Sequence, residues 1–374
     1  MTGTGFSGVT MQKNHEEKDI WTYLTTVQKP VVLYGTGNGA DKILDQLENR
    51  NIRISGIFAS SDFVRDRTFR GYPVESFESL RGRLQKESGM DPIVLLCFGT
   101  SRPEVLENID RIAKECEVYA PDVPVYGQDL FDHDFYKAHE EDLRKVREYL
   151  SDDLSRQTLD ATIRYKLSGD YTLLRDCEEN ITEAKALLSL PKESTFLDLG
   201  AYNGDTLLLY TSLFPNISCA IGVEPDARNF RKLQENTSSL SERIQISYVR
   251  ALISDQDGLS SIDRSKGRGV HEETSKTGVI EELPAKTIGT LSCGRHIDLI
   301  KMDIEGNEKL AILGGQDVIT RDRPSLIVSC YHRSEDLFTL PLLLKEMVPQ
   351  YKIYMRHHPH LLCWDTEFLL TVSD

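Results

Sequence analysis

Long apolar runs, paired cysteines and an excess of basic residues are all missing from this sequence of 374 residues. No apolar run approaches the roughly 18 residues that a membrane-spanning helix needs. The seven cysteines stand singly, without the CxxC spacing of a zinc site or the CxxxCxxC spacing that binds an iron–sulfur cluster. A formal net charge of -15 repels phosphate backbones and anionic lipid. We therefore expect neither a membrane nor a nucleic acid among the partners.

The cysteines and the N-terminus together predict a cytoplasmic protein. Several cysteines lie inside apolar runs such as Ile93–Phe98, which fits buried thiols better than disulfides. Their number is odd, and the N-terminus is rich in Gly, Ser and Thr without the apolar stretch of a signal peptide. Both features are typical of a reducing compartment.

The length and the alternation of apolar runs predict two α/β domains, since a domain has roughly 150 residues. Apolar strands alternate with amphipathic helices in both, as in doubly wound parallel sheets. The second sheet should have seven strands, and a short connection before the last one favours an antiparallel last strand. We expect a disordered or loosely attached leader at 1–28, a first domain at 29–131, a helical connector at 132–190 and a second domain at 191–374.

The strongest local signal is the segment Asp198–Thr206, DLGAYNGDT. An acid ends a strand, Gly200 permits a sharp turn, and Gly204 lets a ligand approach the next helix. The Gly-x-x-x-Gly spacing differs from the Gly-x-Gly-x-x-Gly that cradles a pyrophosphate. It suits a nucleoside that carries an amino-acid tail.

A second acid, Glu224, ends the next predicted strand in the segment IGVEPD. A carboxylate in this position can accept two hydrogen bonds from a ribose diol. The alternative is that Asp198 only caps its turn and Glu224 is a solvated acid at a strand end. Because the two motifs follow in order at the ends of adjacent strands, they favour a nucleoside cofactor.

Further polar side chains follow two later strands. Asp303 and Glu305 come directly after the apolar strand Ile297–Met302, and His332 comes after the next strand. The carboxyl ends of parallel strands meet at one edge of the sheet, where ligands bind. We therefore expect all three side chains at the crevice.

These motifs resemble the FkbM family of S-adenosylmethionine (SAM)-dependent methyltransferases. The resemblance rests on DLGAYNGDT, on GVEPD and above all on IDLIKMDIEGNE at Ile297–Glu308, with SCYHRSED and RHH further on. It covers residues 191–374 and implies O-methylation of a small-molecule acceptor, such as a sugar, a nucleotide-linked sugar or a natural product. The cofactor-binding positions implied are Asp198, Gly200, Tyr202, Gly204, Glu224, Pro225 and Asp303. Tyr202 and Asn307 stand where many relatives carry Asn and Ala.

Methyl transfer to a hydroxyl requires an aligned acceptor and a group that takes its proton. We expect His332, Asp303 and Glu305 to be catalytic, with His332 as the first choice of base because imidazole titrates near neutral pH. A purely structural hydrogen bond is the alternative for His332. The three side chains could instead hold a divalent cation that lowers the pKa of the acceptor, although we do not favour a metal.

Three other features carry weaker expectations. Residues 255–284 are polar and glycine-rich, which is typical of a lid or a disordered insertion, and we expect a mobile lid over the acceptor. His357 and His358 are as suited to substrate contact as to chemistry. Lys301 is expected to be solvated or to face the lid, without a role.

The first domain, with YGTGNGA and GIFASSD, looks like the small Rossmann-type domain ahead of some methyltransferases in sugar biosynthesis. Its glycine turn could hold a nucleotide diphosphate of the substrate. However, the strand Ile52–Phe58 ends without the acid that an NAD site requires. A degenerate domain that only packs or forms a homodimer is the alternative. Two other function classes stay open, a nicotinamide-dependent oxidoreductase and a non-catalytic cofactor-binding protein.

Overall fold

The computed structural model describes residues 18–60, 68–263 and 280–372, and the chain divides into two compact units. The first comprises Met1–Val123, Phe131–Lys137 and Ile163–Leu173, and the second comprises Pro124–Leu130, Ala138–Thr162 and Leu174–Asp374. The segment expected as a separate connector is thus shared between the units. It contains α5 (His133–Tyr149), α6 (Asp153–Ser168), α7 (Thr172–Arg175) and α8 (Ile181–Lys185).

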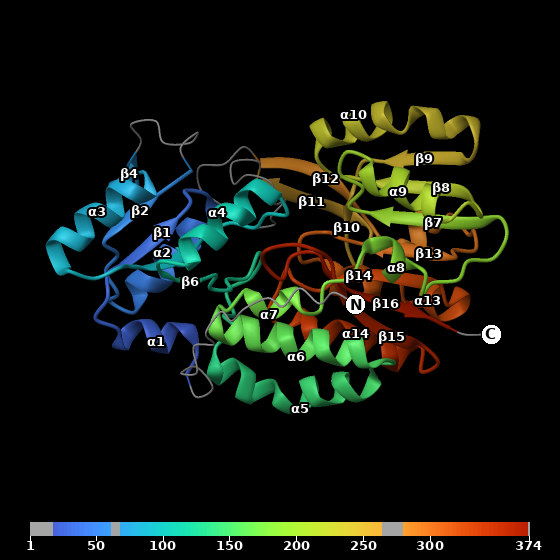
Figure 1. The fold of residues 1–374 in the computed structure, drawn as a ribbon. Coiled ribbons are helices and arrows are strands. Elements are labelled where there is room, and N and C mark those ends of the chain that lie inside the picture. Colours follow the sequence, from blue (N-terminus) through green and yellow to red (C-terminus); the bar gives the residue numbers. More distant parts are fainter. Residues whose placement is uncertain (1–17, 61–67, 264–279, 373–374) are drawn as a thin grey trace, which may run out of the picture. The chain divides into compact units, whose positions relative to one another are not determined.

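A six-stranded sheet in the order β3-β4-β2-β1-β5-β6 forms the centre of the first unit (Figure 1). All pairs are parallel except β3 with β4. Every residue of β1 and β5 is buried, as expected for a sheet covered on both faces. The elements are α1 (Ile20–Thr26), β1 (Val31–Tyr34), α2 (Asn38–Asn49), β2 (Gly56–Phe58), β3 (Thr68–Phe69), β4 (Tyr72–Glu75), α3 (Phe77–Ser88), β5 (Ile93–Leu96), α4 (Pro103–Ala113) and β6 (Glu117–Tyr119).

The expectation of a loose leader is wrong for residues 18–28, while residues 1–17 lie outside the described part of the chain. Asp19 caps α1, because its Oδ1 accepts a hydrogen bond from the backbone N–H of Thr22 at 2.7 Å. The helix buries Ile20, Trp21 and Leu24. An apolar helix face with its own cap holds this segment in place.

The second unit is built on a seven-stranded sheet in the order β15-β16-β14-β13-β7-β8-β9. Only β16 runs antiparallel, between β14 and β15, so both the strand number and the antiparallel last strand are confirmed. The strands are β7 (Ser194–Leu199), β8 (Ile217–Val223), β9 (Gln245–Val249), β13 (Leu299–Met302), β14 (Ser325–Ser329), β15 (Lys352–His357) and β16 (Thr366–Thr371).

Helices connect these strands, and several turns between a strand and the next helix line the candidate site described below. They are α9 (Asp205–Leu213), α10 (Ala227–Asn236), η2 (Ser238–Glu242), α11 (Ile288–Ser292), α12 (Glu308–Gly314), α13 (Gln316–Asp322) and α14 (Asp336–Met347). No helix among the described residues combines the length and the apolar character needed to cross a membrane.

The stretch expected as an irregular lid begins and ends as a regular β-ribbon. Strands β11 (Gly258–Asp263) and β12 (Ile280–Lys286) pair antiparallel, and β12 also pairs with β10 (Leu252–Ile253) (Figure 1). The expectation of irregular structure is therefore wrong for these ends. Residues 264–279 lie outside the described residues, so a lid stays a prediction.

Candidate functional site

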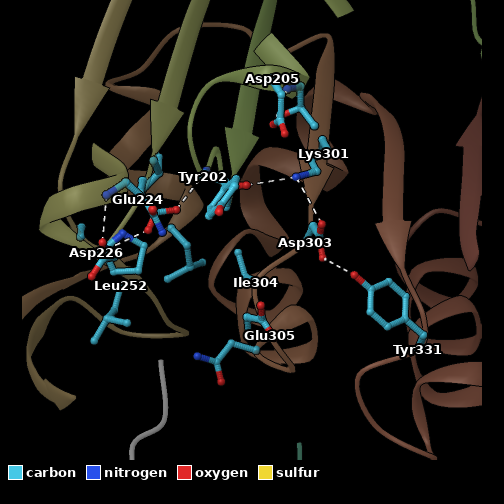
Figure 2. A pocket seen from close by; sticks show the side chains of 18 of the residues that line it. Tyr202, Asp205, Glu224, Asp226, Leu252, Lys301, Asp303, Ile304, Glu305 and Tyr331 are labelled. Carbon is cyan, nitrogen blue, oxygen red and sulfur yellow. Dashed lines mark hydrogen bonds and ion pairs between the residues drawn. The ribbon is translucent and has the colours of Figure 1, made fainter. Parts of the chain in front are cut away.

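A cavity of about 330 Å³ opens in the second unit, where β7, β8 and β13 end. Figure 2 shows Glu224 and Asp226 at one side and Tyr331 at the other, with Lys301 and Asp303 between them. Ligands of doubly wound sheets bind at this edge. Among the residues expected in the site, those that line the cavity are Gly200, Tyr202, Glu224, Pro225, Asp303 and Glu305.

Glu224 is the most nearly enclosed acid of the cavity wall, with a relative exposure of 6 %. Its Oε2 accepts a hydrogen bond from the backbone N–H of Tyr202 at 3.0 Å, and its Oε1 accepts one from that of Asp226 at 2.8 Å. Each oxygen keeps a further lone pair for a ligand. Burial raises the pKa of Glu224 to about 7. This carboxylate is fixed in orientation and suits the two hydroxyls of a ribose.

The turn after β7 depends on its two glycines. Gly200 has φ +82°, and a Cβ there would overlap the carbonyl oxygen of Asp303. Gly204 has φ +89°, and a Cβ there would overlap the side chain of Thr237. Gly204 does not line the cavity. It therefore serves the packing of the turn, whereas the sequence suggested that it admits the ligand.

Asp198 is fully buried and is absent from the cavity wall. Its Oδ2 accepts a hydrogen bond from the hydroxyl of Thr206 at 2.6 Å. Its Oδ1 has no hydrogen-bond partner among the described residues and stands 3.6 Å from Nζ of Lys301. Asp198 thus supports the turn from behind and does not meet the cavity directly.

Asp303 is the carboxylate on which the charged groups of the site converge. Its Oδ1 accepts a hydrogen bond from the hydroxyl of Tyr331 at 3.1 Å and lies 3.4 Å from Nε2 of His332. Its Oδ2 lies 3.6 Å from Nζ of Lys301. Burial works to raise the pKa of Asp303, but the charges of Lys301 and His332 hold it below its ordinary value. Asp303 is therefore ionised at neutral pH, and its side chain is still about a third exposed (35 %).

His332 lies behind Asp303 with a relative exposure of 1 %, and it does not line the cavity. Its Nδ1 lies 2.9 Å from Oε1 of Glu308, and its Nε2 lies 3.8 Å from Oε2 of Glu305. Burial would lower the pKa of His332, but the surrounding carboxylates, Glu308 foremost, raise it to about 10. An imidazolium has no lone pair, so this geometry does not support His332 as the general base.

Glu305 lines the cavity from the turn after β13, with φ +55°. Its side chain is 42 % exposed, and burial of the rest raises its pKa. It can reach a ligand, and within the described part of the chain no hydrogen bond fixes its carboxylate in the way that Tyr331 fixes that of Asp303.

One group of side chains in the described chain has the spacing of a metal site, but it differs from the group expected. Ligand atoms of Glu308, His332 and Asp336 lie within 4.8 Å of one another, and all three side chains are buried. The backbone N–H of Ile304 donates to Glu308 at 2.9 Å, and that of Arg333 donates to Asp336 at 2.8 Å. These bonds give the cluster a structural role behind Asp303, outside the cavity.

His357 and His358 are both buried away from the cavity. His357 shares a hydrogen bond with the hydroxyl of Thr366 at 2.9 Å, and Nε2 of His358 lies 2.8 Å from Oε1 of Glu367. Burial lowers the pKa of each imidazole to about 4. They connect β15 to its surroundings as neutral groups and meet no ligand in this cavity.

Lys301 is the residue that the sequence reading missed. It lines the cavity and is buried, with a relative exposure of 5 %, so the expectation of a solvated side chain is wrong, while a position facing a lid stays a prediction. In the sheet it pairs in register with Asp198. The sequence does contain a signal for this position, because Lys301 stands between apolar residues in a strand that is buried throughout. A buried lysine needs a partner of opposite charge.

The sheet order with its one antiparallel strand, and the cavity at the ends of β7 and β8, are consistent with a Rossmann-like methyltransferase fold in the second unit. Residues 198–356 match the sequence model described as the methyltransferase FkbM domain.

The fold of the whole chain has a solved counterpart. The methyltransferase FkbM from Methylobacillus flagellatus superposes with a TM-score of 0.70 at 20% identity, over 91% of this chain and 90% of that chain. A SAM-dependent methyltransferase from Aquifex aeolicus is similar at TM-score 0.31 and 11% identity, over 54% of this chain and 99% of that one. No curated protein matches the chain. The first likeness supports two Rossmann-like units in one chain.

Proposed function

We propose that the protein transfers a methyl group from SAM to a hydroxyl of a small-molecule acceptor, such as a sugar, a nucleotide-linked sugar or a natural product. The observation that carries this proposal is Glu224, a buried carboxylate whose two oxygens are fixed by backbone N–H groups at the wall of the cavity. The FkbM domain match supplies the class of reaction.

The residues present fit SAM as the cofactor, which supplies an electrophilic methyl group when bound. Glu224 would accept hydrogen bonds from the ribose hydroxyls. Leu252 and Ile253 of β10 give the same end of the cavity an apolar wall that suits the flat face of an adenine. Gly200 lines the same cavity at the turn after β7, where the amino-acid tail would lie.

Between Glu224 and Tyr331 in the cavity, Asp303 is the side chain best placed to receive the proton of the acceptor. It is ionised, it is partly exposed, and Tyr331 fixes one of its oxygens. His332, as an imidazolium behind it, keeps the carboxylate in place and charged. Glu305, Asn307 and Asp365 complete a wall of hydrogen-bond acceptors and donors that suits a neutral, hydroxylated acceptor.

Calorimetry on the full chain tests the cofactor assignment. Glu224→Gln should weaken SAM binding by about tenfold or more, because hydrogen bonds to a charged group contribute roughly 1.5–3 kcal/mol. Glu242→Gln, an exposed glutamate on η2, is the matched control and should leave the affinity unchanged. Unchanged affinity in a folded Glu224→Gln protein, or tighter binding of NAD than of SAM, would overturn the proposal.

A further inference from the structure

Lys301 places a buried ammonium in the wall of the cavity. Its side chain is 7 % exposed, and its Nζ donates a hydrogen bond to the carbonyl oxygen of Gly200 at 3.1 Å. The carboxylates of Asp198 and Asp303 each stand 3.6 Å away. Burial alone would lower the pKa of this lysine, but the two carboxylates hold it above its ordinary value. The cavity wall therefore contains a cation at neutral pH.

The hydrogen bonding around this cation is incomplete. An ammonium has three N–H groups, and a separation of 3.6 Å is too long for a normal hydrogen bond. Asp198, which is fully buried, leaves its Oδ1 without a hydrogen-bond partner among the described residues. Buried charged groups with unmade hydrogen bonds raise the free energy of the folded protein. An anionic ligand group entering from the cavity would give Lys301 the hydrogen bonds that it lacks.

The position of Lys301 relative to Glu224 indicates which ligand group that is. Strands β8, β7 and β13 are neighbours in that order, so the two residues flank the Gly200 turn from opposite sides. Neighbouring strands lie roughly 4.8 Å apart, which separates the ends of β8 and β13 by about 10 Å. A ligand whose ribose is held by Glu224 fills the rest of the cavity with the substituent on its 5′ carbon. In SAM this substituent is a methionine whose tail carries one carboxylate and one ammonium.

We propose that Lys301 binds the carboxylate of the methionine tail, an inference that rests on the proposed cofactor. The carboxylate accepts a charge-assisted hydrogen bond from Nζ. The carbonyl oxygen of Gly200, which accepts a hydrogen bond from Nζ, has a second lone pair for the ammonium of the same tail. The lysine and the flanking carboxylate of Asp303 thus present opposite charges to a ligand that is itself zwitterionic at this end.

The contribution of the carboxylate is tested by measuring, by calorimetry on the full chain, the affinities of three ligands that differ in the tail. SAM and decarboxylated SAM differ only in the carboxylate, and 5′-methylthioadenosine lacks the whole amino-acid tail. The wild-type protein should bind SAM about tenfold or more tightly than decarboxylated SAM, because a hydrogen bond between charged groups is lost. Equal affinity for these two ligands would overturn the proposal without any mutant.

The variant Lys301→Met tests whether Lys301 is the residue that binds the carboxylate. It should weaken SAM binding by about tenfold or more and change the affinity for the other two ligands by less than about threefold. Lys309→Met, at an exposed position on α12, is the matched control. Equal losses for all three ligands would assign Lys301 to the support of the turn alone. If the variant fails to fold, the ratio of the wild-type affinities for SAM and decarboxylated SAM decides. A wild-type protein that binds none of these ligands contradicts the proposed function instead.

Discussion

Both units contain a strand that ends in a glycine turn before a helix, but the surroundings of the two turns differ. After β1, the ring of Tyr34 stacks on Phe58 at 4.5 Å and meets Phe98 edge-on at 4.9 Å. The hydroxyl of Tyr34 shares a hydrogen bond with Ser60 at 2.7 Å and accepts one from Asn108 at 3.0 Å. Aromatic side chains thus occupy the end of this strand, and their polar atoms already have partners.

After β7, the corresponding space is a cavity, and the next strand ends in a carboxylate. Glu224 stands where the first unit has Ala59 and Ser60 after β2. The comparison teaches that strand, glycine turn and helix define a fold, whereas the side chains at the neighbouring strand ends decide whether it binds a nucleoside. We accordingly place the cofactor in the second unit alone.

The largest expected effect concerns Asp303, which has no counterpart in the first unit. Asp303→Asn should reduce turnover by roughly 10²–10⁴-fold, because the amide cannot accept the proton of the acceptor. The dissociation constant of SAM should change far less. Transfer of label from methyl-labelled SAM to a hydroxylated acceptor, with calorimetry alongside, measures both.

Glu305→Gln is the matched control for that change, since it removes a more exposed carboxylate from the same turn. Its loss of turnover should be at least about tenfold smaller than that of Asp303→Asn. The opposite ranking would move the proton acceptor to Glu305.

A pair of glycine substitutions compares the two turns directly. A Cβ at Gly200 would overlap the carbonyl oxygen of Asp303, and one at Gly39 would overlap that of Cys97. Changing either residue to alanine should lower the free energy of unfolding by about 1–3 kcal/mol, as measured by urea denaturation. Only Gly200→Ala should also weaken SAM binding. Gly37→Ala, where φ is -111° and nothing lies within 4 Å, should be tolerated. Weakened SAM binding in Gly39→Ala would show that the first unit takes part.

The smallest expected effect is a pH dependence that originates at Glu224. Its pKa is about 7 in the free protein, and ribose hydroxyls donate hydrogen bonds to the ionised form. SAM affinity should therefore be constant above about pH 8 and fall by up to about tenfold per pH unit below pH 7, as the carboxylate takes up a proton. Calorimetry across this range measures the slope, and Glu224→Gln should remove it. An affinity that rises on acidification would mean that another group controls binding.

The sequence predicted those parts of the site that depend on strand order. Strands β7 and β13 are wholly buried and mostly apolar, and Glu224 follows the next strand after β7 in the chain, so topology alone brings these ends together. The roles of Lys301 and His332 could not be predicted in this way. These roles depend on how deeply each side chain is buried and on what it contacts: Lys301 lies beside Asp198, and His332 lies behind Asp303.

The β-ribbon formed by β11 and β12 also escaped the sequence reading, for a different physical reason. Its strands are polar, and Pro284 lies inside β12, a residue that usually argues against a strand. Pairing with β11 and β10 nevertheless holds β12 in place on both sides. Long-range pairing of this kind leaves little periodic signal in a single sequence.

The stoichiometry of cofactor binding tests the comparison of the two units most directly. Calorimetric titration of the full chain with S-adenosylhomocysteine should give one site per chain, and Glu224→Gln should weaken that site by about tenfold or more. Two sites per chain, or a single site whose affinity is unchanged in folded Glu224→Gln, would contradict the account.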